Sequence, residues 1–395
     1  MPDATLRHRA KSLLTASGRS NVPPFMVMDV MAAAARIEAA GGHVIHMEVG
    51  QPAASAPRSA ILAAHAALDV GRIDYTSALG IPSLRERIAR HYRETYGCAV
   101  DAERVVITTG SSGGFILGFL ALFEPGDRVA VTVPGYPPYR HILTALGCEP
   151  VLIETSSETR HALTGEALLS AHRKTPLKGV LVGSPANPTG TMMSREALTS
   201  LMAAAESAGI RFISDEIYHG LDYAFPAVTA AELSPDALVI NSFSKYFCMT
   251  GWRVGWMVVP EPLVRPIERL QQNLAISVPT LSQIAAEAAF EGRAEMEEIK
   301  HGYQENRRIL IEGLPKAGLD TFLPADGAFY LYADASKFTS DSFKFAGEML
   351  EKARVAATPG VDFDPIHGRQ FIRFSYARSA DEMREAVARI AQWLR

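Results

Sequence analysis

The chain has 395 residues, of which 48% are hydrophobic and 21% charged, and its net charge is −4. This length predicts two domains that share a cleft, and the composition of an ordinary globular enzyme excludes a long disordered tail. The slightly acidic balance predicts that the chain has no nucleic-acid partner and no membrane partner.

Three cysteines, Cys98, Cys148 and Cys248, are odd in number and widely separated, without the spacing of metal ligands. Free thiols in a reducing compartment are therefore expected, which predicts a cytoplasmic protein without a metal site. The longest apolar run, residues 115–123, is too short to cross a bilayer. Residues 6–20 are rich in Arg and Ser and are expected to form a solvated arm.

Five short apolar runs, rich in β-branched residues, alternate with longer helical patterns. Such runs are typical of strands buried on both faces of a parallel sheet. One of the helices is expected over residues 194–208, with Ser194 as N-cap and Gly209 as the stop. The expected strands are residues 104–109, 128–133, 179–183, 210–214 and 237–240.

One more run, residues 253–259, follows the fifth after a connection too short for a crossover helix, so it is expected to be antiparallel. The pattern predicts an α/β fold with a three-layer large domain and a mostly parallel sheet. In such sheets ligands bind beyond the carboxyl ends of the parallel strands. The residues that follow each run are therefore the candidates for chemistry.

After the first run, residues 110–114 read Gly-Ser-Ser-Gly-Gly and precede a helix-like stretch. The backbone N–H groups of such a turn, here at Ser111 and Ser112, can hold a phosphate, although the same turn also occurs as a plain connection. After the second run, Tyr136 lies in a loop stiffened by three prolines. Its ring either stacks on a planar cofactor or packs within the loop.

Asn187 follows the third run and precedes a proline, as a turn former or as an amide donor to a ligand. Asp215 and Tyr218 follow the fourth run. A carboxylate at this point either caps a helix or pairs with the nitrogen of a pyridine ring and keeps it protonated.

Lys245 follows the fifth run, at the end of Asn-Ser-Phe-Ser-Lys, and Arg253 comes soon after it. The alternative is a solvated surface lysine. A neutral lysine amine, however, forms a Schiff base with an aldehyde, and an arginine fork suits a phosphate. Together the two residues indicate a site for pyridoxal phosphate.

The chain resembles the fold-type I, class I and II aminotransferases that use pyridoxal phosphate, over nearly its whole length. The motifs that carry the resemblance, in chain order, are Val-Gly-Gln-Pro at 49–52, Tyr75 with Gly-Ile-Pro-Ser-Leu-Arg at 80–85, the turn at 110–114, Asn-Pro-Thr-Gly at 187–190, Ser-Asp-Glu-Ile-Tyr at 214–218, Ser-Phe-Ser-Lys at 242–245, Gly-Trp-Arg-Val-Gly at 251–255 and Ile-Arg-Phe-Ser at 372–375.

The resemblance implies a role for each matched residue. Lys245 would be the Schiff-base lysine and the base that moves the substrate proton, with Asp215 on the pyridine nitrogen and Tyr218 and Asn187 on the ring oxygen. Tyr136 would stack on the ring, and Ser111, Ser112, Ser242 and Arg253 would hold the phosphate. Arg373 would receive the substrate carboxylate, with Asn187 and the backbone of Gly50 beside it. Tyr75 would reach the phosphate of the neighbouring subunit, which implies a homodimer with composite sites.

The expected activity is ping-pong transfer of an amino group between an L-amino acid and a 2-oxo acid. Residues 271–283 contain no basic residue, although relatives that prefer dicarboxylic donors commonly bring a second arginine from the neighbouring subunit. A neutral, branched or aromatic donor is therefore expected.

Two other functions stay open on the same scaffold. A β- or γ-eliminating lyase or synthase would keep all the cofactor residues and differ in the shape of its pocket. A non-catalytic transcription regulator would need a DNA-binding module before residue 21, where the resemblance begins, and a less acidic chain.

The expected large domain covers residues 52–290. The smaller α+β domain would combine residues 1–51 with residues 291–395, including strands at 327–332 and 371–375. Arg373 would then lie on the small domain and the cofactor on the large one.

Overall fold

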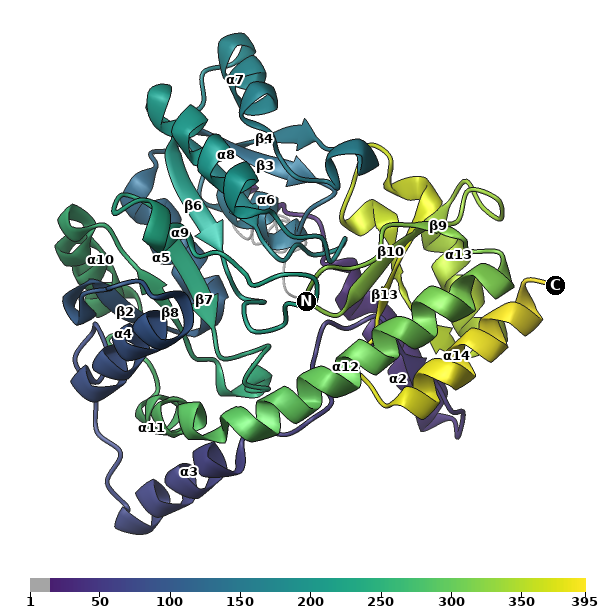
Figure 1. The fold of residues 1–395 in the computed structure, drawn as a ribbon, viewed down its shortest axis with the longest axis horizontal. Coiled ribbons are helices and arrows are strands. Elements are labelled where there is room, and N and C mark those ends of the chain that lie inside the picture. Colours follow the sequence, from purple (N-terminus) through teal and green to yellow (C-terminus); the bar gives the residue numbers. More distant parts are fainter. Residues whose placement is uncertain (1–14) are drawn as a thin grey trace, which may run out of the picture.

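A seven-stranded mixed sheet forms the centre of the larger part of the molecule (Figure 1). The computed structural model describes residues 15–395. Only β8 runs antiparallel to its neighbours, as expected from its short connection. In sheet order the strands are β2 (Val105–Thr108), β8 (Gly255–Val258), β7 (Leu238–Ser242), β6 (Arg211–Asp215), β5 (Gly179–Gly183), β3 (Arg128–Val133) and β4 (Glu149–Glu154).

The five parallel runs and the antiparallel run expected from the sequence are all present, with ends shifted by a few residues. Arg253, expected at the start of the antiparallel strand, instead has a left-handed backbone (φ 52°) in the turn before β8. The edge strand β4, whose partner in the sheet is β3, was not expected from the sequence. Its apolar run, residues 150–153, lies between Glu149 and Glu154 and is mostly half-exposed, because an edge strand is covered less than a central one.

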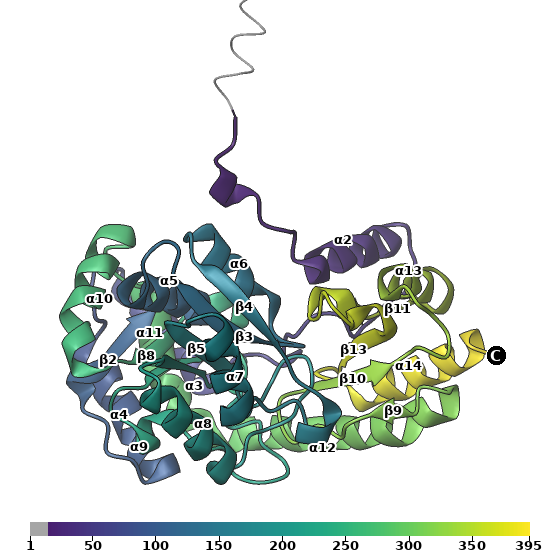
Figure 2. The ribbon, with the colours of Figure 1, turned by 90° about the horizontal axis from the view of Figure 1, so that it is seen from above.

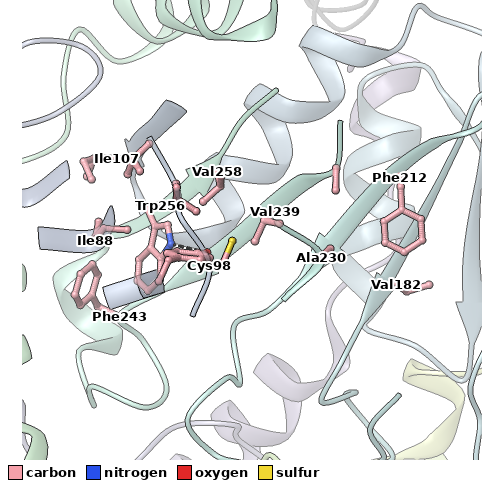
Figure 3. Close-up of a cluster of buried hydrophobic side chains, with 14 of the residues drawn as sticks. Ile88, Cys98, Ile107, Val182, Phe212, Ala230, Val239, Phe243, Trp256 and Val258 are labelled. Carbon is pink, nitrogen blue, oxygen red and sulfur yellow. Dashed lines mark hydrogen bonds between the residues drawn. The ribbon is translucent and has the colours of Figure 1, made fainter. Parts of the chain in front are cut away.

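Alternate residues of the central strands face two separate hydrophobic cores. In β8, Trp256 and Val258 pack in one core and Met257 in the other. In β7, Val239 packs with Trp256, as Figure 3 shows, whereas Ile240 packs with Met257. Because side chains alternate along a strand, an apolar residue at every position requires a cover on both faces.

Helices supply that cover and complete three layers. The core on one face is completed by α5 (Gly110–Leu122), α6 (Pro137–Ala145) and α10 (Glu261–Leu274). The core on the other face is completed by α3 (Arg58–Val70), α4 (Pro82–Tyr96), α7 (Gly165–Lys174), α8 (Arg195–Ser207), α9 (Ala230–Leu233) and α11 (Thr280–Ala289). The expected cap of α8 is present, since Ser194 Oγ accepts from the Ala197 backbone N–H at 3.2 Å.

The smaller part of the molecule is built on a four-stranded antiparallel sheet with a core of its own. In sheet order its strands are β12 (Thr358–Pro359), β13 (Phe371–Ser375), β10 (Tyr330–Asp334) and β9 (Thr321–Phe322). The strand expected at 371–375 is confirmed. The one expected at 327–332 begins later, because Gly327 and Ala328 form a turn whose backbone N–H groups bond to Gly190 and Leu221.

Four helices pack around this second sheet, and one of them links the two parts. α12 (Arg293–Gly313) runs from the larger part to the smaller one, where α14 (Ala380–Trp393) lies beside it (Figure 1). Figure 2 shows α2 (Met26–Ala39) near α13 (Ser342–Glu348). β1 (Ile45–His46) pairs in parallel with β11 (Val355–Ala356).

The expected fold class is confirmed: an α/β fold with a seven-stranded mixed sheet and a smaller second domain. The boundaries at residues 52 and 290 stay a prediction. Residues 6–14 of the expected N-terminal arm lie outside the described residues. Among residues 15–395, no helix has both the length and the apolar character that a membrane span requires.

Trp256 generates a prediction for stability, because it is 1% exposed and its indole N–H donates to Tyr92 Oη at 3.2 Å. Trp256→Ala should lower the free energy of unfolding by about 3–5 kcal/mol, since it removes a large buried ring and leaves a cavity. The midpoint of urea unfolding measures the change. Phe343→Ala, at a ring that is 54% exposed, is the control and should change the free energy by about 0.5 kcal/mol or less. Equal shifts in the two variants would contradict the packing described for β8.

Candidate active site

A cavity lies at the carboxyl ends of the parallel strands, where the second sheet faces the first. Three groups of elements line it: the loops after β2, β3, β5, β6 and β7, the start of α2, and the segments around Gly50, Tyr330 and Arg373. The lining residues that concern the chemistry are Phe25, Val27, Met28, Gly50, Ser111, Ser112, Tyr136, Tyr139, Asn187, Asp215, Ile217, Tyr218, Ser244, Lys245, Thr250, Arg253, Tyr330 and Arg373.

Lys245 lies in the turn after β7, with its amine in the cavity. Its Nζ donates to the backbone carbonyl of Gly50 at 2.5 Å. Desolvation and the nearby cations Arg373 and Arg253 together lower the pKa of Lys245 to about 8, against the smaller opposing effect of Asp215. A substantial fraction of the amine is therefore neutral near pH 7 to 8, as a nucleophile requires.

Asp215 is the last residue of β6 and is 4% exposed. One carboxylate oxygen accepts from the Ile217 backbone N–H at 3.1 Å, and the other accepts from the phenol of Tyr139. Burial raises the pKa of Asp215 to about 6, while these two donors and Lys245 hold it down. The carboxylate therefore stays mostly ionised at neutral pH and is available to a cationic ring nitrogen.

Tyr139 was not assigned a role from the sequence, although it belongs to the same proline-rich loop as Tyr136. The loop leads directly into α6, so Tyr139 falls in the first turn of that helix, three residues after the N-cap Tyr136. The two rings meet edge to face with centroids 5.2 Å apart. Tyr136 also contacts the ring of Phe25 at the start of α2, at 5.9 Å. Both tyrosines thus form one wall of the cavity.

The opposite end of the cavity carries donors for an anion. Ser111 and Ser112 lie in the first turn of α5, whose N-terminus attracts negative charge. Arg253 lies beside this turn, and its Nη1 donates to the Thr250 carbonyl at 2.9 Å. A Cβ added to Gly110 would lie 2.4 Å from Arg253 Nη2, so glycine is required for the guanidinium to approach.

Ser242 does not reach this cavity, in contrast to the expectation. It belongs to β7, and its hydroxyl donates to the Val254 carbonyl at 3.2 Å and to Ser244 Oγ at 2.9 Å. Ser244 lines the cavity instead. The difference arises because Ser242 is the last residue of β7, where strand pairing fixes its direction, whereas Ser244 lies in the turn after the strand.

Arg373 lies in β13 and is 1% exposed. Its guanidinium carbon is 4.4 Å from the ring centroid of Tyr330 and 4.6 Å from that of Phe363. Nη1 donates to Asn187 Oδ1 at 2.9 Å, and Nη2 donates to the Glu48 backbone carbonyl. Nε is buried without a hydrogen-bond partner among residues 15–395. A buried cation with a free donor and no carboxylate partner fits a carboxylate ligand.

Tyr218 and Tyr330 both line the cavity and are hydrogen-bonded to each other, with their phenol oxygens 2.7 Å apart. Tyr330, which lies far along the chain in β10, was not assigned a role from the sequence. A Cβ added to Gly50 would lie 1.8 Å from Tyr330 Oη, so the loop at Gly50 touches this phenol directly. Tyr75 is outside the cavity and 79% exposed, so its expected role in a neighbouring subunit stays a prediction.

These residues fit pyridoxal phosphate. The neutral amine of Lys245 suits its aldehyde, and the ionised Asp215 suits its ring nitrogen. Arg253 and the N-terminus of α5 suit its phosphate, and Arg373 keeps a free donor for a substrate carboxylate. Within the described part of the chain, no group of three or more His, Cys, Asp or Glu side chains is arranged to hold a metal ion.

Comparisons with known proteins agree with this geometry. Residues 42–390 match the family model described as aminotransferase class I and II. The chain is 48% identical over 380 residues to a valine–pyruvate aminotransferase from Mycobacterium tuberculosis, a match that covers 95% of this chain and 97% of that protein.

Two solved structures extend the likeness to the fold. An aminotransferase from Mycobacterium tuberculosis is similar with a TM-score of 0.93 and 47% identity, over 96% of this chain and 99% of that one. An aspartate aminotransferase from Thermus thermophilus with maleate is similar with a TM-score of 0.90 and 31% identity, again over 96% and 99% of the two chains.

The lowered pKa of Lys245 predicts its reactivity in protein stripped of cofactor. Its amine is protonated and unreactive well below pH 8, so labelling by an aldehyde followed by borohydride should rise as the pH crosses about 8. The labelling of an ordinary exposed lysine should rise only as the pH approaches ~10.4. Mass spectrometry of the peptide that contains Lys245 gives the labelled fraction at each pH. A midpoint at the ordinary lysine value would contradict the desolvated amine described above.

Tyr139→Phe tests the phenol that donates to Asp215. Loss of the donor should raise the pKa of Asp215 above about 6, because the hydrogen bond favours the ionised form. Affinity for pyridoxal phosphate, measured by equilibrium dialysis, should fall by about tenfold at pH 7 and by less at pH 9. Tyr332→Phe is the matched control, since the buried Tyr332 hydroxyl has no hydrogen-bond partner among the described residues. A pH-independent loss in Tyr139→Phe would instead indicate a packing defect.

Proposed function

Because the chain belongs to the class I and II aminotransferases, which use pyridoxal phosphate, we propose that it transfers an amino group from a neutral, branched-chain L-amino acid to a 2-oxo acid. The valine–pyruvate aminotransferase to which it is 48% identical supports a branched donor and a small acceptor such as pyruvate. The expected aromatic donors stay a second choice within the same class.

The proposal rests on the number of positively charged side chains in the cavity. Its only lysine and arginine side chains among the described lining residues are Lys245, Arg253 and Arg373. Lys245 would bind the cofactor's aldehyde, Arg253 its phosphate and Arg373 the substrate's α-carboxylate. A side-chain carboxylate would have no cation of this chain left, and burying an unpaired charge is costly.

The wall that remains for the substrate side chain is largely apolar. Phe25, Val27 and Met28 come from the start of α2, and Ile217 comes from the turn after β6. Burial of an apolar substrate side chain against such a wall stabilises the bound substrate by about 0.8 kcal/mol per CH₂ group removed from water. Valine, leucine or isoleucine therefore fits better than aspartate or glutamate.

The proposed roles follow from charge placement. When bound, pyridoxal phosphate supplies an electron sink for the electrons left at the substrate's α-carbon. Lys245 Nζ, as a neutral amine, takes up the α-proton, while the carboxylate of Asp215 keeps a proton on the ring nitrogen. Tyr218 and Asn187 would donate to the ring oxygen, Tyr136 would stack on the ring, and Ser111, Ser112, Ser244 and Arg253 would bind the phosphate. Arg373 and the backbone at Gly50 orient the substrate's carboxylate end.

An eliminating lyase or synthase on this scaffold, left open by the sequence, receives no support from the relatives described above, which are aminotransferases. The same holds for a non-catalytic regulator. The expected cytoplasmic location stays a prediction.

A donor panel tests the proposal. With pyruvate as acceptor, the purified enzyme should use valine, leucine or isoleucine with a kcat/KM at least about tenfold above that for aspartate, because the aspartate side chain would lack a counterion. Arg373→Gln should raise the KM for these donors at least about 30-fold, which corresponds to ~2 kcal/mol for one member of a buried charge pair. Aspartate as the best donor would overturn the assignment, and release of ammonia without an acceptor would indicate elimination.

We also propose a homodimer with composite sites. Large apolar side chains are exposed on α3, on the loop after it and at the end of α10; they are Leu62, Leu68, Val70, Ile73, Tyr75, Leu274 and Ile276. Exposed apolar groups of this size favour a surface that another protein covers. A second copy that brings Tyr75 to this chain's phosphate site would cover them.

Light scattering of the purified protein should give twice the mass of one chain. If the sites are composite, mixing inactive Lys245→Ala and weakened Tyr75→Ala subunits should restore part of the activity, because a mixed dimer holds one site with both residues intact. A monomer, or mixing without any recovery, would contradict composite sites.

A further inference from the structure

The segment from Ile45 to Gln51 passes under the cavity and holds two of its three cations through backbone carbonyls. The Glu48 carbonyl accepts from Arg373 Nη2, and the Gly50 carbonyl accepts from Lys245 Nζ. The hydroxyl of Thr358 also donates to the Glu48 carbonyl, at 2.8 Å, and lies 3.1 Å from Arg373 Nη2. The position of the Glu48 backbone therefore sets where the guanidinium of Arg373 lies.

The side chain of Glu48 points away from this contact and is fully buried. Its Oε1 lies 2.8 Å from His46 Nδ1, and its Oε2 has no hydrogen-bond partner among residues 15–395. A buried carboxylate is stable only when it is paired, so His46 is the group on which the position of Glu48 depends.

The other ring nitrogen of His46 reaches a different element. His46 Nε2 lies 3.0 Å from Glu38 Oε1, in the last turn of α2. The first turn of the same helix carries Val27 and Met28 into the cavity wall. α2 has two fully buried residues, Val27 and Ala34, and its half-buried side chains add to a small hydrophobic cluster around Ala34. The polar contact at the end of the helix supplements this small apolar contact.

The charges around His46 are those of a cation between two carboxylates. The hydrogen bond to Glu48 raises the pKa of His46 to about 9 against the effect of burial, and Glu38 adds to the rise. These two carboxylates, from its own segment and from α2, are the charged groups that face the ring. On α14, which packs against β11, Arg389 is directed to His43 and Glu385. Both ring nitrogens therefore donate at neutral pH, and this arrangement is lost only as the pH rises through about 9.

We propose that His46 is a positioning residue, which anchors the Glu48 segment that seats Arg373 and ties α2 to that segment. One side chain thereby sets both the receptor for the substrate carboxylate and the α2 wall that meets the substrate side chain. This inference rests on the proposed role of Arg373. It assigns His46 no contact with the substrate, the cofactor or a reacting atom.

Two substitutions separate the two contacts. The amide nitrogen of asparagine takes the place of Nδ1, so His46→Asn keeps the contact with Glu48 and loses Glu38. The longer glutamine takes the place of Nε2, so His46→Gln keeps Glu38 and loses Glu48. His301→Gln, at an exposed histidine of α12, is the matched control.

Binding of 3-methylbutanoate to the enzyme loaded with cofactor, measured by calorimetry, reports the carboxylate receptor without any turnover. His46→Gln should weaken this binding about tenfold and raise the donor KM by a similar factor, with kcat within about twofold of the original. His46→Asn should bind the probe within about twofold of the original, while amide hydrogen exchange in residues 26–39 becomes about tenfold faster. His301→Gln should change neither quantity.

The outcomes separate this inference from the proposed function. If Arg373→Gln binds the probe as tightly as the unmodified enzyme does, the proposed carboxylate receptor is wrong. The rate of amide hydrogen exchange in α2 then tests the contact between His46 and Glu38 by itself. If Arg373→Gln loses the probe while His46→Gln and His46→Asn match the original enzyme in binding and in exchange, the receptor stands and the positioning role of His46 is wrong. A fall in kcat with an unchanged KM in His46→Gln would also overturn it.

Discussion

Three cationic side chains share one cavity, and their mutual repulsion is the constraint around which the site is built. Lys245, Arg253 and Arg373 come from different elements, and the two arginines lower the pKa of the lysine to about 8 in addition to the effect of burial. Among residues 15–395, neither arginine has a carboxylate partner within hydrogen-bonding distance; instead, backbone carbonyls and the amide oxygen of Asn187 hold them. Such neutral partners orient a guanidinium without cancelling its charge, so the cavity retains a positive field that suits a phosphate and a carboxylate.

The fold supplies this arrangement because a parallel sheet collects its strand ends at one edge. Each loop needs to place only one or two side chains, while the two cores on either side of the sheet fix the strands themselves. The second sheet contributes Arg373 from β13 and Tyr330 from β10, and these two strands pair with each other. The carboxylate receptor therefore belongs to a separate core, and the geometry between the receptor and Lys245 depends on how the two parts meet.

The sequence predicted the parts of the site that follow directly from strand ends. Asp215, Lys245 and Arg253 stand out because a polar side chain ends an apolar run, and the resemblance to a family added Arg373. Side-chain direction within a turn was not predictable, which is why Ser242 was expected where Ser244 lies. Tyr139 and Tyr330 were missed because their roles depend on contacts with residues distant in the sequence. The edge strand β4 was missed although residues 150–153 are apolar, and the apolar wall from α2 was missed because it depends on where that helix packs.

The close approach of Gly50 to Tyr330 has a consequence for how this enzyme can diverge. A methyl group at position 50 would overlap the phenol oxygen of Tyr330, which in turn bonds to Tyr218. A side chain at position 50 would therefore clash with Tyr330 unless Tyr330 changes as well. The effects of substitutions at the two positions are thus coupled, despite their separation in the chain. A mutational library that varies these positions one at a time would miss the variants in which a side chain at position 50 is accommodated by a change at position 330, whereas a library that varies both together would include them.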